Sequence, residues 1–190
     1  MIELLYLIFL VLVSLALGRR ILKAIGVNFQ NNLEDFVFSY PLGLALLAYI
    51  TFFFGIVGLL YKFAIILVLL VLFIILIKDI KDIVLILFNF AQKININELI
   101  KKRKHFDFFK ILFILLLFFF LINLILSFVP PWHFDVLAYH LAIQKLYINS
   151  HQITYIPYIF YSNLPSLVDT IYLIGLLLYN GILSNLLAYS

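Results

Sequence analysis

The chain contains no cysteine, and only 12% of its 190 residues are charged. Without cysteine there is no disulfide framework, no thiolate metal site and no cysteine nucleophile. Soluble domains are about 25% charged and about 45–50% apolar, whereas 66% of this chain is hydrophobic. A chain this apolar could not hide its hydrophobic surface in water. The composition therefore excludes soluble globular, disordered and fibrous proteins and predicts an integral membrane protein.

The net charge of +4 does not indicate a nucleic-acid partner. The basic residues stand at the ends of apolar runs, which is the pattern that orients membrane spans and not a stripe that binds phosphates. The first apolar run has Glu3 where a signal peptide would have basic residues, and Arg19 and Arg20 follow it. We therefore interpret this run as a retained span.

Apolar runs of about the length that crosses a bilayer, roughly 20 residues, recur along the chain. They predict an all-α, polytopic transmembrane helix bundle of about five spans and the start of a sixth. The predicted spans are residues 2–17, 36–57, 60–77, 111–129 and 165–179. A tight hairpin around Gly58 joins the second to the third, and proline ends the fourth because it cannot continue a helix. A new apolar run begins after Asn180-Gly181.

The chain divides into three parts: the spans of residues 1–77, a basic and amphipathic segment at 78–110, and residues 111–190. Apolar residues from Ile80 to Ala91 recur at helical spacing, which predicts a helix resting in the membrane interface. The cluster Lys101-Lys102-Arg103-Lys104 has two interpretations. It could bind an anionic lipid headgroup, or it could simply stop and orient the next span.

Positive charge predicts the orientation. If residues 18–35 and 78–110 face the cytoplasm, they hold eleven of the thirteen basic residues. Only Lys62 and Lys145 then stay outside, a bias that favours this topology. The protein is accordingly expected in the cell membrane as a multi-pass protein, with its amino terminus and the loop 130–164 external. That loop is expected to carry helices lying along the membrane surface.

Candidate chemistry gathers in this external loop. Asp135 follows the fourth span by a few residues, near the membrane surface, where desolvation raises a carboxyl pKa. Such a carboxylate could act as a general base or hold a divalent cation against a phosphate. The alternative is structural, because Asp135 precedes a helical pattern and aspartate often caps a helix start.

Other polar residues of this region have two interpretations each. His133, Asp135 and His140 do not have the spacing of a helical ligand pair, so we predict no metal site. Asp169 lies one turn into the fifth predicted span, where it could point into the loop's cavity or reach the interface. The exposed aromatic residues, such as Trp132, are expected to form an interfacial belt or a stacking surface for a sugar.

One run of residues resembles a known family. The run begins at Pro130-Pro131-Trp132, passes Asp135 and Tyr139-His140-Leu141 to Lys145-Leu146-Tyr147, and is followed by Asn163-Leu164-Pro165. It resembles the start of the polytopic glycosyltransferases of the GT-C class, which take sugars from polyprenyl-phosphate donors. Mannosyl- and aminoarabinosyltransferases of this class carry a "W-D-x-x-x-Y-H-L" run. Here two residues separate the Trp from the Asp. The resemblance covers about residues 111–185.

The resemblance implies roles for individual residues. Asp135 would be the catalytic carboxylate, acting as a base or holding Mg²⁺ or Mn²⁺, while Tyr139, His140 and Lys145 would contact phosphate or sugar. The bilayer and a polyprenyl-phosphate-linked sugar would be the partners. Since members of the class have more spans than this chain, it would be an amino-terminal portion of such an enzyme. The alternative is a non-catalytic membrane subunit or a truncated remnant that packs against other spans.

Overall fold

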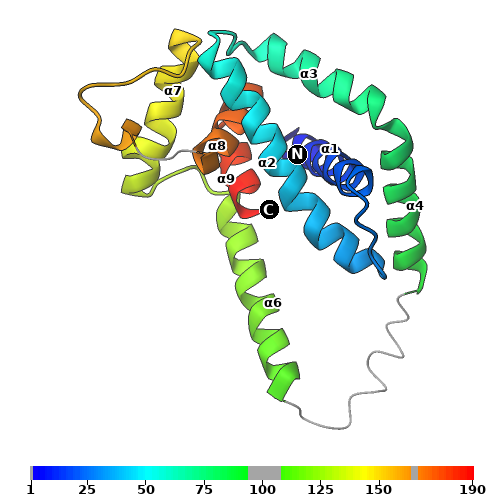
Figure 1. The fold of residues 1–190 in the computed structure, drawn as a ribbon. Helices are drawn as coiled ribbons and strands as arrows, with labels where there is room; N and C mark the ends of the chain where they lie inside the picture. Colours follow the sequence, from blue (N-terminus) through cyan, green and yellow to red (C-terminus); the bar gives the residue numbers. More distant parts are fainter. Residues whose placement is uncertain (1, 94–107, 164–166) are drawn as a thin grey trace.

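The computed structural model describes residues 2–93, 108–163 and 167–190, and every regular element in these ranges is a helix (Figure 1). The predicted all-α class is confirmed for these residues. The basic cluster at 101–104 lies outside them. In chain order the elements are α1 (Ile2–Ala24), α2 (Asn32–Ile56), α3 (Lys62–Ile75), α4 (Ile77–Lys93), α6 (Phe108–Ser127), the π-helix η1 (Val136–His140), α7 (Leu141–Ser150), the 3₁₀ helix η2 (Phe160–Asn163), α8 (Leu167–Leu178) and α9 (Gly181–Tyr189).

Two of the described helices, α1 and α2, are long and apolar enough to cross a membrane. The number rises to three if α3 and α4 form a single bent span. Residues Ile114–Ser127 of α6 and Val168–Leu178 of α8 are shorter apolar helices. These helices are compatible with a membrane protein, but they do not support about five spans.

Helices α1 and α2 run antiparallel and touch backbone to backbone. The contact is made by small residues four positions apart, Ser14 and Gly18 on α1 and Ser39 and Gly43 on α2. A Cβ atom added to Gly43 would lie 1.8 Å from the carbonyl oxygen of Ser14, and one added to Gly18 would lie 1.9 Å from that of Ser39. Small residues at this spacing share one helix face and let two backbones approach closely.

Polar residues continue this contact toward the α1–α2 connection. Asp35, one turn before Ser39, accepts a hydrogen bond from the Ser39 hydroxyl at 2.9 Å. Its other carboxylate oxygen lies 2.7 Å from Nε of Arg19, and the two side chains are only 11% and 12% exposed. Asn31 caps α2, since its side chain accepts a hydrogen bond from the backbone N–H of Glu34. The ends of the two helices are therefore fixed by polar contacts.

Residues 62–93 form two helices that meet at 72°. Helix α3 has 14 residues, which makes it about 21 Å long, so the predicted third span at 60–77 ends early. The guanidinium of Arg20 holds the bend, because it donates a hydrogen bond to the carbonyl of Ile75 at 3.1 Å and pairs with Asp79 at 3.0 Å. The amphipathic helix predicted after residue 78 is present as α4, and its Ile80 is buried.

The segment predicted as the fifth span, residues 165–179, is a shorter apolar helix in the structure. It forms α8, which has 12 residues and is about 18 Å long. Its first turn meets the segment after α6, because Asp169 is hydrogen-bonded to His140. The residue just beyond its end, Gly181, packs on Pro131 of that same segment, where an added Cβ would lie 3.0 Å from the ring Cγ. Its length and these contacts do not support a fifth span at residues 165–179.

Helix α9 returns along α8. A Cβ added to Gly175 would lie 2.5 Å from the backbone nitrogen of Ser184, and the Ser184 hydroxyl donates to the carbonyl of Tyr172 at 2.8 Å. The side chain of Asn180, between the two helices, donates to the carboxylate of Glu3 at 3.2 Å. The α8–α9 turn therefore lies beside the amino-terminal end of α1.

The predicted hairpin between the second and third spans is present, with Gly58 at a φ of +74°. The segment after α7 binds to this hairpin. The N–H of Leu60 donates to the carbonyl of His151 at 3.1 Å, and the N–H of Ile153 donates to the carbonyl of Gly55 at 2.9 Å. The α2–α3 hairpin and the loop after α7 thus lie at the same end of the molecule, as expected if both face the same side of a membrane.

Candidate functional site

The candidate site forms where the helix after Pro130-Pro131 widens into a π turn. The helix begins at Phe134, and from Val136 to His140 it is a π-helix, so that the N–H of Leu141 donates to the carbonyl of Val136. Such turns are rare and occur frequently at functional sites. The two residues at the end of this turn, Tyr139 and His140, are the ones that contact α8 and the loop before it.

His140 and Asp169 form a carboxylate–imidazole pair. Nδ1 of His140 lies 2.7 Å from Oδ1 of Asp169, and both side chains are partly buried, 33% and 20% exposed. The Tyr172 ring stacks on the imidazole from the next turn of α8, with the ring centroids 5.8 Å apart. When Nδ1 carries the proton and donates a hydrogen bond to the carboxylate, Nε2 carries no proton and can accept a hydrogen bond. Of the two interpretations of Asp169, the structure therefore supports the one in which it points toward the loop.

Asp135 and Tyr139 lie on the same helix four residues apart, and Tyr161 of η2 stacks on Tyr139 with the ring centroids 4.2 Å apart. Partial burial raises the pKa of Tyr139 above the usual value for tyrosine. The negative charge of Asp135 and a hydrogen bond to its carboxylate raise this pKa further. Tyr139 is consequently a neutral phenol at neutral pH, and it can donate a hydrogen bond to Asp135.

The structural role considered for Asp135, that of a helix cap, is wrong. Its backbone is already helical, with φ −59° and ψ −42°, and its side chain makes no capping hydrogen bond. A capping residue has a non-helical backbone and accepts a hydrogen bond from the following turn. The Asp135 side chain is also exposed. The side chain that lies next to Asp135 in the structure is Tyr139.

The structure does not bring Lys145 into this cluster. Lys145 is exposed on α7, and no hydrogen bond or ion pair joins it to the other candidates. Among the described residues no three His, Asp or Glu side chains lie where they could hold a metal ion together. Of the expected aromatic belt, Trp132, Tyr155 and Tyr158 are well exposed, whereas Tyr147 is buried.

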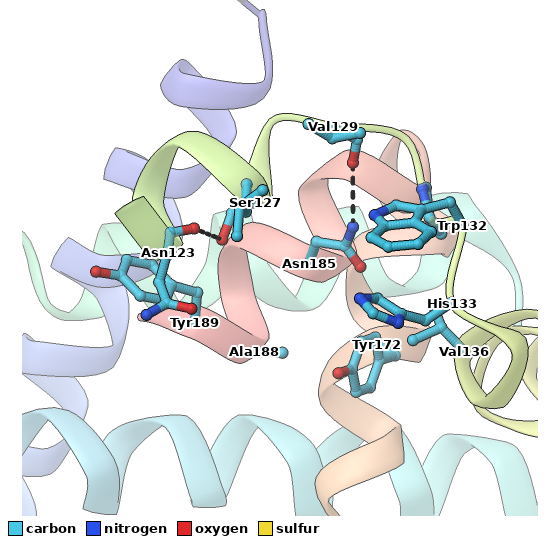
Figure 2. Close-up of a pocket in the computed structure, with 12 residues that line it drawn as sticks. Asn123, Ser127, Val129, Trp132, His133, Val136, Tyr172, Asn185, Ala188 and Tyr189 are labelled. Carbon is cyan, nitrogen blue, oxygen red and sulfur yellow. Dashed lines mark hydrogen bonds between the residues drawn. The ribbon is translucent and has the colours of Figure 1, made fainter. Parts of the chain in front are cut away.

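An open hollow of about 340 Å³ lies beside the carboxylate–imidazole pair, because Tyr172, which stacks on the imidazole of His140, also lines the hollow. Figure 2 shows Trp132, His133 and Tyr172 on one side of the hollow and Asn123, Ser127 and Tyr189 on the other. The indole of Trp132 lies over the imidazole of His133, with the ring centroids 4.0 Å apart. The polar side chains of the hollow that sequence reasoning missed are Asn123, Ser127, Tyr172, Asn185 and Tyr189. Asn123 and Asn185 could have been noticed in the sequence, because each is an asparagine within a largely apolar run.

The carboxylate–imidazole pair predicts a measurable coupling. Replacing His140 by Gln and Asp169 by Asn, singly and together, should give a coupling free energy of about 1 kcal/mol in a double-mutant cycle of thermal unfolding. The expected value is at the low end for a charge-assisted bond because both groups are partly exposed. A cycle of His140→Gln with Lys145→Gln is the control and should be additive. Additive behaviour of the His140–Asp169 cycle would contradict the pairing.

The cluster combines a carboxylate–imidazole pair, a second carboxylate with a phenol beside it, and a hollow with exposed aromatic rings. Groups of this kind can accept a proton from a hydroxyl group and contact the hydroxyls and faces of a sugar. No protein-family model, no curated protein and no solved structure matches this chain.

Proposed function

We propose that this chain is the amino-terminal membrane portion of a GT-C glycosyltransferase that takes a sugar from a polyprenyl-phosphate-linked donor. The observation that carries the proposal is the position of Asp135. It stands beside Tyr139, and the next residue, His140, pairs with Asp169 at 2.7 Å. Asp135, Tyr139 and His140 of the family-like run therefore lie close together, which supports the proposal.

The proposal includes a topology. The amino terminus and residues 130–164 face the outside, and residues 18–35 and 78–110 face the cytoplasm. Helices α1, α2, α3 and α6 cross the membrane, and α4 rests in the interface on the cytoplasmic side. Support comes from the distribution of the basic residues and from the binding of the loop after α7 to the α2–α3 hairpin. Helix α6 has 20 residues, so it is about 30 Å long and matches the hydrocarbon core.

The chemistry proposed is displacement at the anomeric carbon. Asp135 accepts the proton of an acceptor hydroxyl, and the hydroxyl oxygen attacks the anomeric carbon of the donor. The bond between this carbon and the phosphate oxygen breaks, and polyprenyl phosphate leaves with the electron pair. Tyr139 and His140 contact the sugar or its phosphate, and Trp132 offers its face to the sugar ring. Lys145 lies outside this cluster, and no three His, Asp or Glu side chains among the described residues are placed to hold Mg²⁺ or Mn²⁺, so neither enters the proposed step.

Sugar transfer by membranes that contain the complete protein tests this proposal. The comparison is between the natural protein and the Asp135→Asn variant, which keeps the shape of the side chain but not its basicity. Loss of transfer with an unchanged amount of folded protein supports the assignment. Unchanged transfer would remove Asp135 from the chemistry.

The alternative function is that of a non-catalytic membrane subunit, and the surface of α6 favours it. Apolar side chains around this helix are exposed, among them Phe118, Leu121 and Ile125. They are available to lipid or to other spans. Under this function no chemistry depends on Asp135, so both Asn and Ser at position 135 leave the protein's function unchanged. The two functions therefore separate on the same set of variants.

A further inference from the structure

A second polar cavity lies at the opposite end of α1 and α2, where residues 25–31 connect them. Its volume is about 160 Å³, and its walls include Arg19, Lys23, Asn28, Gln30 and Asn32. A cavity of this size holds several waters or one tetrahedral oxyanion. It shares no residue with the hollow near Trp132. The proposed function makes no use of it.

The charges around this cavity are unbalanced. Arg19 and Lys23 bring two positive charges, and Asp35 brings one negative charge. Both oxygens of the Asp35 carboxylate are already occupied, one by the Ser39 hydroxyl and the other by Nε of Arg19. Glu34, at the start of α2, receives a hydrogen bond from the Asn31 side chain and does not line the cavity. One positive charge is therefore left over at its wall.

Arg19 also has an unused donor. Its Nη1 atom is buried and has no hydrogen-bond partner among the described residues. A buried donor without a partner costs free energy, more so on a charged group. A planar guanidinium presents its donors in a fork that matches the oxygens of a phosphate. The neighbouring amides of Asn28, Gln30 and Asn32 add neutral donors.

We propose that this cavity binds a phosphate group through Arg19 and Lys23. The inference depends on the proposed membrane topology only for the source of the phosphate. With α1 and α2 across a bilayer, the cavity lies at the level of lipid headgroups, and an anionic phospholipid supplies the group. Free phosphate from the aqueous side has the same chemistry and reaches the same residues.

The test measures stabilisation of the full chain by defined phosphates. Unfolding temperature and amide exchange of residues 25–31 are followed in detergent with inorganic phosphate, and in phosphatidylcholine nanodiscs with and without phosphatidic acid. We expect a rise in unfolding temperature and slower exchange. Lys23→Gln should weaken the binding about threefold, as expected for an exposed ion pair. Arg19→Lys keeps a charge opposite Asp35 but loses the guanidinium fork, so it should weaken binding about tenfold.

Lys81→Gln is the matched control, because it removes an exposed positive charge from α4 without touching the cavity. Stabilisation by phosphatidic acid alone identifies a lipid headgroup, and stabilisation by inorganic phosphate in detergent identifies free phosphate. Either result supports the proposal when Lys23→Gln weakens it and Lys81→Gln does not. No stabilisation by either probe, or equal weakening by Lys23→Gln and Lys81→Gln, would overturn it. This experiment does not measure sugar transfer, so a failure of the phosphate-site proposal can be distinguished from a failure of the proposed function.

Discussion

Sugar transfer should fall at least about 100-fold when Asp135 is replaced by Asn, since a positioned general base contributes about 10²–10⁴-fold to a rate. The amide is isosteric with the carboxylate but does not accept a proton at neutral pH. Because Asp135 is exposed and makes no capping hydrogen bond, the substitution should leave the unfolding temperature unchanged. The measurement is the initial rate of transfer from a polyprenyl-phosphate-linked sugar, in membranes with equal amounts of each protein.

Two further variants sharpen this test. Asp82→Asn removes another exposed carboxylate, on α4, and should transfer sugar at the natural rate. Asp169→Asn removes the partner of His140 and should lower transfer less than Asp135→Asn, because it acts through His140. If Asp82→Asn slows transfer as much as Asp135→Asn, surface charge and not the site controls the rate, and the catalytic role of Asp135 is excluded.

Gly43→Ala should destabilise the protein by about 3 kcal/mol, at the upper end for overpacking. The added methyl group would lie 1.8 Å from the Ser14 carbonyl oxygen and 3.0 Å from the backbone nitrogen of Gly18. Backbone atoms cannot move aside as a side chain does, so α1 and α2 must separate. Helix propensity alone favours alanine over glycine by about 1 kcal/mol. The expected loss of stability is therefore opposite in sign to the change that helix propensity alone would give.

Chemical unfolding in mixed micelles, followed by circular dichroism, measures this change. Gly181→Ala is the control, because its added Cβ would meet only side-chain atoms of Pro131 and Leu141, the nearest at 3.0 Å. It should change stability by less than about 1 kcal/mol. If Gly43→Ala is as stable as the natural protein, the backbone contact between α1 and α2 is looser than the structure has it.

The sequence predicted the helical class and several helix boundaries correctly, because both depend on local patterns. The apolar runs predicted α1 and α2, Gly58 predicted the hairpin, and the prolines after residue 129 predicted the end of α6. The close contact of α1 with α2 was not predicted. Ser14, Gly18, Ser39 and Gly43 have the right spacing, but nothing local indicates that these two faces meet.

The errors have a common physical cause. Apolarity and length make residues 165–179 look like a span, yet the direction of α8 is set by contacts with distant residues, His140 at one end and Pro131 at the other. The same holds at the candidate site. Asp135, Tyr139 and His140 could be singled out from the sequence, whereas the pairing of His140 with Asp169 depends on the π turn and on the position of α8.

Whether α8 crosses the membrane decides on which side the residues after it lie. With residues 130–164 outside, a crossing at 165–179 would put Asn180 in the cytoplasm. If α8 does not cross, the proposed topology instead leaves Asn180 on the outer side, next to Glu3. A tag placed at the α8–α9 turn would then be accessible from outside the cell, and α9 would run inward along α6, where the Tyr189 hydroxyl donates to the carbonyl of Phe120.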